Sequence, residues 1–290
     1  MCRWIAYTGG PVYLEELLLK PAHSLIDQSL SARAGATTTN GDGFGVGWYG
    51  TRAEPGLYRS VQPAWSDENL VNLCAQIKSP LFMAHVRSTT GTSIQQTNCH
   101  PFQHGGWLFQ HNGAINGFQR IKRELMLAIL PDLFPRIAGS TDSEIMFYLA
   151  LTFGLQDDVV SGVEKMISFI EDVGRENDIA DPLQMTLAIS DGVTLYAFRY
   201  SSEGRSRTLF HSADVATLRK RFPNVRQFTD DARAIVSEPL GAAETNDEVW
   251  IEVPESSVVR VAGGALDVTP LRFRTAKAKG GSAARATVGA

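Results

Sequence analysis

The sequence predicts an α+β fold in which antiparallel sheets lie between layers of helices. Strand-like runs dominate the start of the chain, amphipathic helices follow, and strands return after residue 184 with several hairpin signals. This order does not fit a repeating βαβ array, and no internal repeat is visible. With 290 residues, 43% of them hydrophobic, the chain can bury a substantial core.

The first half of the chain is predicted to alternate short strands with helices. Arg3 to Tyr7 forms a strand that the Gly9-Gly10-Pro11 cluster ends, and Gln28 to Asn40 forms a loop. Ser66 is the predicted N-cap of a helix whose apolar stripe runs to Ile77 and includes Cys74, which is therefore expected in the core. The remaining expected elements are a short helix around Leu14–Leu18 and strands over Phe44–Tyr49, Leu81–Val86 and Trp107–His111.

The second half is predicted to contain two helices and then two hairpins. Thr141 and Glu144 form a capping-box pattern that starts a helix beside Asp142, and a second apolar stripe covers Val159–Val173. The hairpin turns are expected at Asp191-Gly192 and Gly263-Gly264. Their flanking strands are Met185–Ser190 with Thr194–Tyr200, and Val258–Val261 with Ala265–Val268.

Composition favours a single cytoplasmic domain over residues 1–273, followed by a disordered tail over 274–290 that is rich in Lys, Gly, Ala and Ser. The net charge is −4, with both signs mixed along the chain, so nucleic acid is not an expected partner. No apolar run approaches the ~20 residues that span a bilayer, which argues against a membrane protein. Three irregularly spaced cysteines fit a reducing compartment.

A cysteine at position 2 suggests a specific chemistry. Removal of Met1 would place a thiol and a free α-amino group on the same residue. Because an α-amine has a pKa of about 7.7–8.0 and a thiol about 8.5, the amine can accept the thiol proton near neutral pH. The alternative is a buried cysteine with Met1 retained.

Three further positions offer groups that an amide-cleaving site would need. Arg87 follows a predicted strand, and its planar fork can bind a carboxylate, although a surface ion pair is the alternative. Asn112 and Gly113 supply neutral donors for an oxyanion, whereas the same dipeptide also favours a hairpin turn. The Asp142 carboxylate can bind an ammonium group or serve only to cap its helix.

Two other patterns are interpreted as structural. The glycine-rich segment 40–47 lacks the spacing of a dinucleotide loop and leads into a strand, so we expect its glycines to pass close to the N-terminal cysteine. Asp42 would hold this turn or the α-amine. His100 and His104 have the spacing of a helical zinc pair, but Pro101 and the following glycines oppose a helix there, and no metal is expected.

Six motifs in this order resemble the class II glutamine amidotransferase family of N-terminal-nucleophile hydrolases. They are Met1-Cys2, Asp42-Gly43-Phe44-Gly45 with Trp48, His85-x-Arg87-x-x-Thr90-Gly91, Asn98-x-His100-Pro101, His111-Asn112-Gly113 and Thr141-Asp142-Ser143-Glu144. The resemblance implies a four-layer αββα sandwich of two antiparallel sheets. It also implies that Cys2 is the nucleophile, that Asn112 and Gly113 form the oxyanion hole, and that the substrate binds Arg87, Thr90, Asp142 and the neighbouring His111.

The resemblance implies an amidohydrolase that cleaves glutamine or a γ-glutamyl conjugate through a thioester, without a cofactor. Val86 and Ser88 differ from the Thr and Trp of many synthase-linked members, and no second domain is expected after Phe273. The length is similar to that of the stand-alone subgroup that includes ergothioneine-pathway γ-glutamyl hydrolases. Two alternatives stay open: a glutaminase that delivers ammonia to a separate synthase, and a non-catalytic glutamine-binding regulator.

Overall fold

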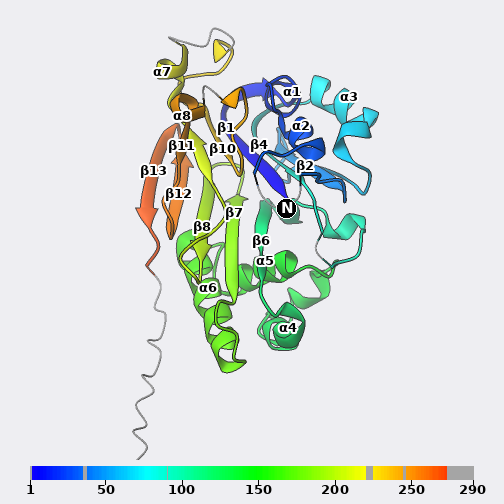
Figure 1. Cartoon of the computed structure of the whole chain (residues 1–290), viewed down its shortest axis with the longest axis vertical. Coiled ribbons are helices and arrows are strands. Elements are labelled where there is room, and N and C mark those ends of the chain that lie inside the picture. Colours follow the sequence, from blue (N-terminus) through cyan, green and yellow to red (C-terminus); the bar gives the residue numbers. More distant parts are fainter. Residues whose placement is uncertain (1, 35–37, 90, 220–224, 244–245, 273–290) are drawn as a thin grey trace, which may run out of the picture.

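Two antiparallel sheets form the centre of the molecule (Figure 1). The computed structural model describes residues 2–34, 38–89, 91–219, 225–243 and 246–272. The seven-stranded sheet has the order β11-β9-β10-β1-β4-β2-β3, and the six-stranded sheet has the order β13-β12-β8-β7-β6-β5. The strands are β1 (Arg3–Tyr13), β2 (Phe44–Tyr49), β3 (Gly56–Ser60), β4 (Lys78–Val86), β5 (Phe102–His104), β6 (Trp107–Ile115), β7 (Leu183–Ser190), β8 (Leu195–Ser201), β9 (Phe210–Ser212), β10 (Arg233–Val236), β11 (Trp250–Glu252), β12 (Ser257–Ala262) and β13 (Ala265–Pro270).

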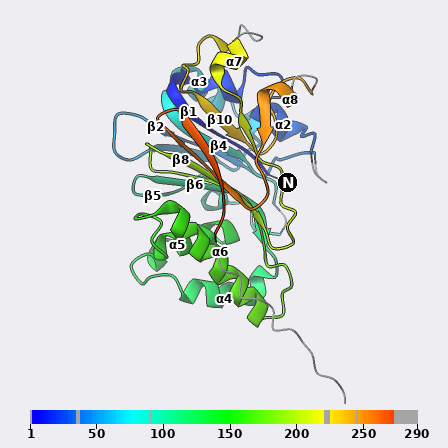
Figure 2. The same cartoon turned by 90° about the vertical axis from the view of Figure 1, so that its left-hand side faces the viewer.

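Helices cover the outer face of each sheet (Figure 2). The seven-stranded sheet carries α1 (Glu15–Leu18), α2 (Leu25–Leu30), α3 (Glu68–Gln76), α7 (Val215–Arg219) and α8 (Asn246–Val249). The six-stranded sheet carries α4 (Phe118–Leu127), α5 (Asp142–Thr152) and α6 (Val159–Glu176). No helix in the described part of the chain is both long and apolar enough to cross a membrane.

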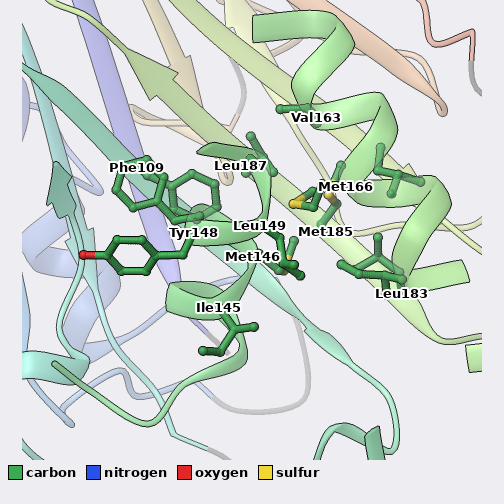
Figure 3. Close-up of a cluster of buried hydrophobic side chains, with 14 of the residues drawn as sticks. Phe109, Ile145, Met146, Tyr148, Leu149, Val163, Met166, Leu183, Met185 and Leu187 are labelled. Atoms are coloured by element: carbon green, nitrogen blue, oxygen red, sulfur yellow. The ribbon is translucent and has the colours of Figure 1, made fainter. Parts of the chain in front are cut away.

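Three apolar cores separate the four layers. The core beneath α4, α5 and α6 includes Phe109, Met166 and Met185 (Figure 3). A second core fills the space between the two sheets, and a third lies between the seven-stranded sheet and its helices. The second contains Trp4, Leu108, Ile235 and Val259, and the third contains Ile5, Leu18, Leu70, Cys74 and Phe82. The predicted αββα sandwich is confirmed, because each sheet buries both of its faces.

The glycines after Tyr7 do not end the first strand as predicted. β1 continues to Tyr13, and its pairing with β4 shifts register between Thr8 and Val12. A Cβ on Gly9 would lie 2.6 Å from the Cα of Ala232, so glycine here permits a close backbone approach inside the sheet instead of a turn.

Helix starts differ from the sequence prediction in detail. Asp67, not Ser66, caps α3, because its carboxylate accepts a hydrogen bond from Leu70 N at 2.8 Å. α2 occupies the beginning of the segment predicted as a loop over residues 28–40. Thr141 caps α5 as predicted, but the Glu144 carboxylate accepts from the backbone N–H groups of residues 138 and 139, so the capping box is only half formed.

Both predicted hairpins are present. β7 and β8 pair across Asp191-Gly192, and β12 and β13 pair across Gly263-Gly264. The predicted tail over 274–290 lies outside the described residues.

Candidate active site

Cys2 directly precedes β1, the central strand of the seven-stranded sheet. β4 and β10 flank this strand, so the residues that follow each of them meet the N-terminus. The half-buried Cys2 Sγ accepts a hydrogen bond from Ser88 N at 3.3 Å and donates to Ser88 O at 3.4 Å. The backbone just after β4 therefore orients the thiol.

Asn112 approaches Cys2 from the other sheet. Its Nδ2 atom donates to Cys2 O at 2.8 Å, and the side chain is buried. The amide has two hydrogens, so one is left for another acceptor. β6 was predicted to end at His111, yet it runs on to Ile115, with Asn112 paired to Thr186. This pairing excludes the hairpin-turn interpretation of Asn112-Gly113.

Gly113 follows Asn112 at a position where no side chain fits. Its φ is +157°, and a Cβ would lie 1.9 Å from Gln184 O and 2.6 Å from His111 Nε2. The glycine thus lets β6 and β7 pass closely beside Asn112, as an oxyanion site built from backbone would require.

Arg87 is buried and faces the loop that follows β4. It donates from Nη1 to Asp42 O at 3.2 Å, and from Nη2 to Thr92 Oγ1 at 2.6 Å and to Ser93 O at 3.2 Å. Among the residues that the structure describes, no acidic side chain forms the surface ion pair considered from the sequence. A guanidinium has five donors, so two are left for a ligand such as a carboxylate. Thr90 lies outside the described residues.

The segment before β2 holds this loop in place. Asp42 Oδ2 accepts a hydrogen bond from Thr89 N at 2.7 Å, so its carboxylate holds a turn, one of the two roles predicted for it. The neighbouring glycines do permit close contacts, but not to Cys2 as expected. A Cβ on Gly43 would lie 2.6 Å from Cys99 Sγ, and one on Gly45 would lie 2.2 Å from His100 O.

Asp142 is half-buried at the first turn of α5 and faces the end of β6. Its Oδ2 accepts from Ile115 N at 2.9 Å, and its Oδ1 accepts from Ser143 N at 2.8 Å. The Ser143 hydroxyl, 3.3 Å from Oδ1, also contacts the His111 ring, with 2.8 Å between Ser143 Oγ and His111 Nδ1. The carboxylate keeps acceptor capacity for an ammonium group.

Three buried histidines form an uncharged layer behind the site. The rings of His85 and His100 stack with centroids 4.2 Å apart, and His85 Nε2 lies 3.1 Å from His111 O. Burial lowers the pKa of His85 to about 3 and also lowers the pKa values of His100 and His111. These histidines are therefore neutral near pH 7, and the ring of His111 is buried rather than open to solvent.

His100 and His104, whose spacing was considered and rejected as a zinc pair, do not lie on a helix. His104 belongs to strand β5, and His100 is buried against His85. Within the described residues, no group of three or more His, Cys, Asp or Glu side chains is placed to hold a metal ion.

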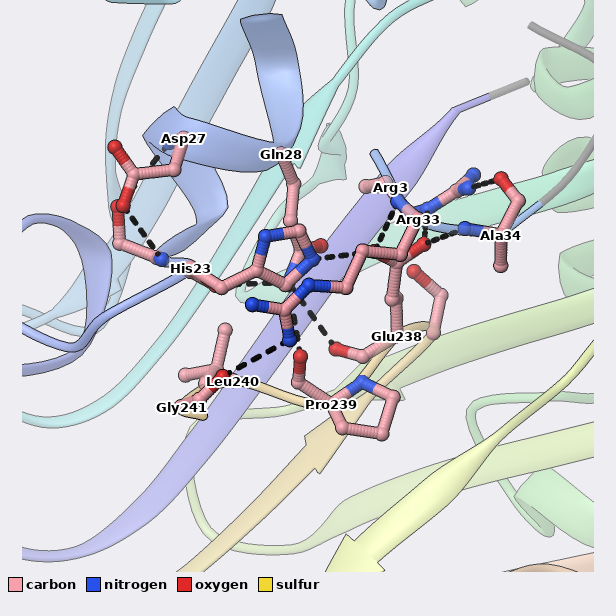
Figure 4. Close-up of polar contacts among 12 residues, drawn as sticks. Arg3, His23, Asp27, Gln28, Arg33, Ala34, Glu238, Pro239, Leu240 and Gly241 are labelled. Atoms are coloured by element: carbon pink, nitrogen blue, oxygen red, sulfur yellow. Dashed lines mark hydrogen bonds and ion pairs between the residues drawn. The ribbon is translucent and has the colours of Figure 1, made fainter. Parts of the chain in front are cut away.

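Sequence reasoning missed a buried ion pair that anchors the N-terminus (Figure 4). Arg3 Nε lies 2.6 Å from Glu238 Oε2, and Arg3 Nη1 donates to Cys2 O at 2.8 Å. Glu238 also accepts from His23 Nε2 at 2.5 Å and from the backbone of Arg33 at 2.8 Å. Burial alone would raise the pKa of Glu238, but the Arg33 N–H bond, the charge of Arg3 and the His23 bond together lower it.

This anchor had no sequence signal. Arg3 and Glu238 are 235 positions apart, and neither belongs to a motif. Arg3 bonds both Cys2 O and Glu238, and so connects the nucleophile candidate to the segment after β10, on the side opposite Ser88.

A cavity of about 530 Å³ opens elsewhere in the molecule. It lies on the outer face of the seven-stranded sheet, where Tyr7, Leu17, Val215 and Trp250 are among its mainly apolar lining. None of the site residues predicted from the sequence lines it. The candidate active site is therefore defined by converging polar groups and not by this cavity.

Comparison with known proteins agrees with the class that the fold and site define. The family model of class II glutamine amidotransferases matches residues 18–283. The chain therefore belongs to the class II glutamine amidotransferases.

Two relatives of known name share most of the chain. The probable glutamine amidotransferase DUG3 of Saccharomyces cerevisiae is 31% identical over 304 residues, covering 93% of this chain and 84% of that protein. The gamma-glutamyl-hercynylcysteine sulfoxide hydrolase of Mycolicibacterium smegmatis is 27% identical over 273 residues, covering 93% and 100%. Members of the family thus include proteins named as amidotransferases and as hydrolases.

A solved structure has the same fold. The glutamine aminotransferase class-II domain protein from Silicibacter pomeroyi aligns with a TM-score of 0.70 and 32% sequence identity. The alignment covers 93% of this chain and all of that chain.

Proposed function

We propose that this chain hydrolyses the γ-amide of glutamine or of a γ-glutamyl conjugate, with Cys2 as an N-terminal nucleophile after Met1 is removed. The observation that carries the proposal is the convergence at Cys2. Ser88 N contacts its thiol, and Asn112 Nδ2 contacts its carbonyl from the other sheet. A nucleophile and an amide donor thus meet across the two sheets.

The first step is attack of the thiolate on the γ-carbonyl carbon. The free α-amine takes the thiol proton, directly or through a water, and the carbonyl oxygen gains the negative charge. The remaining hydrogen of Asn112 Nδ2 and the backbone N–H of Gly113 then stabilise this oxyanion. The C–N bond breaks as the α-ammonium returns its proton to the leaving amine, and water hydrolyses the thioester to release glutamate.

Substrate binding uses groups whose hydrogen-bond capacity is not filled. The two remaining donors of Arg87 bind the α-carboxylate, and the remaining acceptor positions of Asp142 bind the α-ammonium group. Thr90, three positions after Arg87 in the sequence, is the further substrate-binding residue that the resemblance implies. His111 orders this substrate pocket through Ser143, whose N–H and hydroxyl both contact Asp142.

Intact-mass measurement and an activity assay test the proposal together. The purified protein should lack Met1 and should release glutamate from at least one member of a panel of glutamine and γ-glutamyl amides. Cys2→Ala should abolish this release. Cys74→Ala is the matched control, because that thiol is buried far from the site and burial raises its pKa to about 12.

The outcomes separate the alternatives. An active protein that retains Met1, or a Cys2→Ala variant as active as the parent, would refute the mechanism. Binding of glutamine without release of glutamate would favour a regulator. Glutaminase activity that rises only when a synthase co-purifies would favour delivery of ammonia to a partner.

A further inference from the structure

The segment between β8 and β9 lies beside the N-terminus and carries Arg207. Glu255 Oε2 accepts from Ser206 N at 2.9 Å and from Ser206 Oγ at 2.7 Å. On the other side of Arg207, Thr208 Oγ1 donates to Ser237 O at 2.8 Å, and Ser237 N donates to Trp4 O at 3.0 Å. These bonds fix the backbone on both sides of Arg207. Through Ser237 they also join this segment to Trp4, two residues after Cys2.

Arg207 is a cation for which the described part of the chain supplies no hydrogen-bond acceptor. Its Nε atom is buried and has no hydrogen-bond acceptor among the described residues, and no ion pair within that part of the chain includes Arg207. The carboxylates of the neighbouring segments bind other groups. Glu255 binds Ser206 and Arg199 through Oε2, while its buried Oε1 has no hydrogen-bond partner within the described residues, and Glu238 binds Arg3 and His23.

The Arg207 side chain is close to the candidate active site. It lies within electrostatic range of Cys2 and Arg3, and of His111 on the other sheet. The Arg207 side chain is half-buried and its Nε atom is shielded from solvent, and this burial lowers the pKa of Arg207. Because a partly desolvated charge without an acceptor is costly, such a position is suited to an anionic ligand.

The two arginines belong to segments on opposite sides of β1. Arg87 follows β4, and Arg207 precedes β9, whose Phe210 pairs with Val236 of β10. Since β1 lies between β4 and β10, these two segments flank the strand that Cys2 precedes. In a γ-glutamyl substrate, the α-carboxylate lies on one side of the carbonyl that Cys2 attacks, and the leaving amine lies on the other side.

We infer that Arg207 binds a carboxylate on the leaving-amine half of the substrate, so that the preferred substrates are γ-glutamyl derivatives of amino acids or short peptides. This inference rests on the proposed function and adds a specificity-determining residue to it. Glutamine, whose leaving group is ammonia, has no anionic group for Arg207. A peptide such as γ-glutamylglycine has one.

The test compares γ-glutamylglycine with γ-glutamylglycinamide, which differ in a single carboxylate. A charge-assisted hydrogen bond is worth ~1.5–3 kcal/mol, so the wild-type kcat/KM should favour the acid by about 10- to 100-fold. In Arg207→Ala the ratio should fall to about 1. Arg207→Lys keeps the charge but loses the planar fork, so its ratio should be intermediate.

Arg205→Ala is the matched control. That arginine is exposed on the same segment, and its variant should keep the wild-type ratio. Equal hydrolysis of the two substrates by the wild type would overturn the inference. So would an Arg207→Ala variant that loses both activities equally and keeps the ratio, because Arg207 would then only position Cys2.

A binding measurement separates this inference from the proposed function. Calorimetry on the Cys2→Ala protein measures the Kd of each peptide without turnover. A preference for γ-glutamylglycine that disappears when Arg207→Ala is added would support the inference even if the wild type hydrolysed neither compound. Equal Kd values for the two peptides would overturn it even if the wild type were an active hydrolase.

Discussion

The two sides of Cys2 are built differently. On the β4 side, Arg87, Asp42 and the loop after β4 hold one another through hydrogen bonds, and every one of these residues lies in or beside a recognisable motif. On the β10 side, Glu238 and Arg207 come from segments without any motif. The motif-rich side carries the expected glutamyl pocket, whereas the other side anchors the N-terminus and carries Arg207, a cation without an acceptor among the described residues. Motifs therefore mark only half of the surroundings of the nucleophile.

The largest expected effect comes from removing the Arg3–Glu238 ion pair on the β10 side of Cys2. Glu238→Ala leaves Arg3 buried without its partner, which should lower the free energy of unfolding by about 3–5 kcal/mol in urea titrations. The control is Glu252→Ala, because Glu252 is half exposed in its ion pair with Arg199 and should cost no more than ~1 kcal/mol. Equal losses for the two variants would show that the Arg3–Glu238 pair is no more important than a surface bridge.

A second change tests the donor that comes from the six-stranded sheet. Asn112→Ala removes one oxyanion donor, so kcat for γ-glutamyl amide hydrolysis should fall by about 10²–10³-fold while the protein stays folded. Asn116→Ala, four residues further along the chain and exposed, should keep the parental kcat. Unimpaired turnover in Asn112→Ala would remove Asn112 from the oxyanion hole.

A smaller effect probes the loop on the β4 side. Asp42→Ala removes the acceptor of Thr89 N, so the loop beside Arg87 should lose order and KM should rise by about 5- to 10-fold, as expected for ~1–1.5 kcal/mol. Asp67→Ala loses an equivalent bond, to Leu70 N at the start of α3, but far from the site. If Asp67→Ala raised KM as much, the effect would reflect general stability and not the loop.

The smallest expected effect is a pH dependence of the anchor. The folded-state pKa of Glu238 is lowered from its ordinary value of 4.5, so its stabilisation is fully present above about pH 4.5. It is lost as pH falls through the folded-state pKa. The difference in unfolding free energy between the wild type and Glu238→Gln should thus be constant from pH 7 to 5 and shrink below pH 4.5. A difference that grows on acidification would contradict this sign.

Local patterns predicted the elements that depend on neighbouring residues. The hairpin at Asp191-Gly192 and the Thr141 cap of α5 were both correct, because turn and cap chemistry act over two to four positions. The predicted end of β1 was wrong because its cause is not local. Gly9 resembles a turn residue in the sequence, but glycine is needed there because the backbone of Ala232, more than 200 positions away, packs against it.

By itself, the sequence predicted an α+β arrangement of antiparallel sheets between helices, because hydrophobic periodicity is written along the chain. The six motifs predicted the residues around Cys2 through their resemblance to the family. Only the tertiary structure decided which strand ends meet Cys2. It placed Asn112 on the Cys2 carbonyl, Glu238 on Arg3, and Arg207 within electrostatic range of Cys2. The physical reason is that a buried hydrogen bond or ion pair is decided by proximity in the folded sheets, and no local pattern records which distant partner satisfies it.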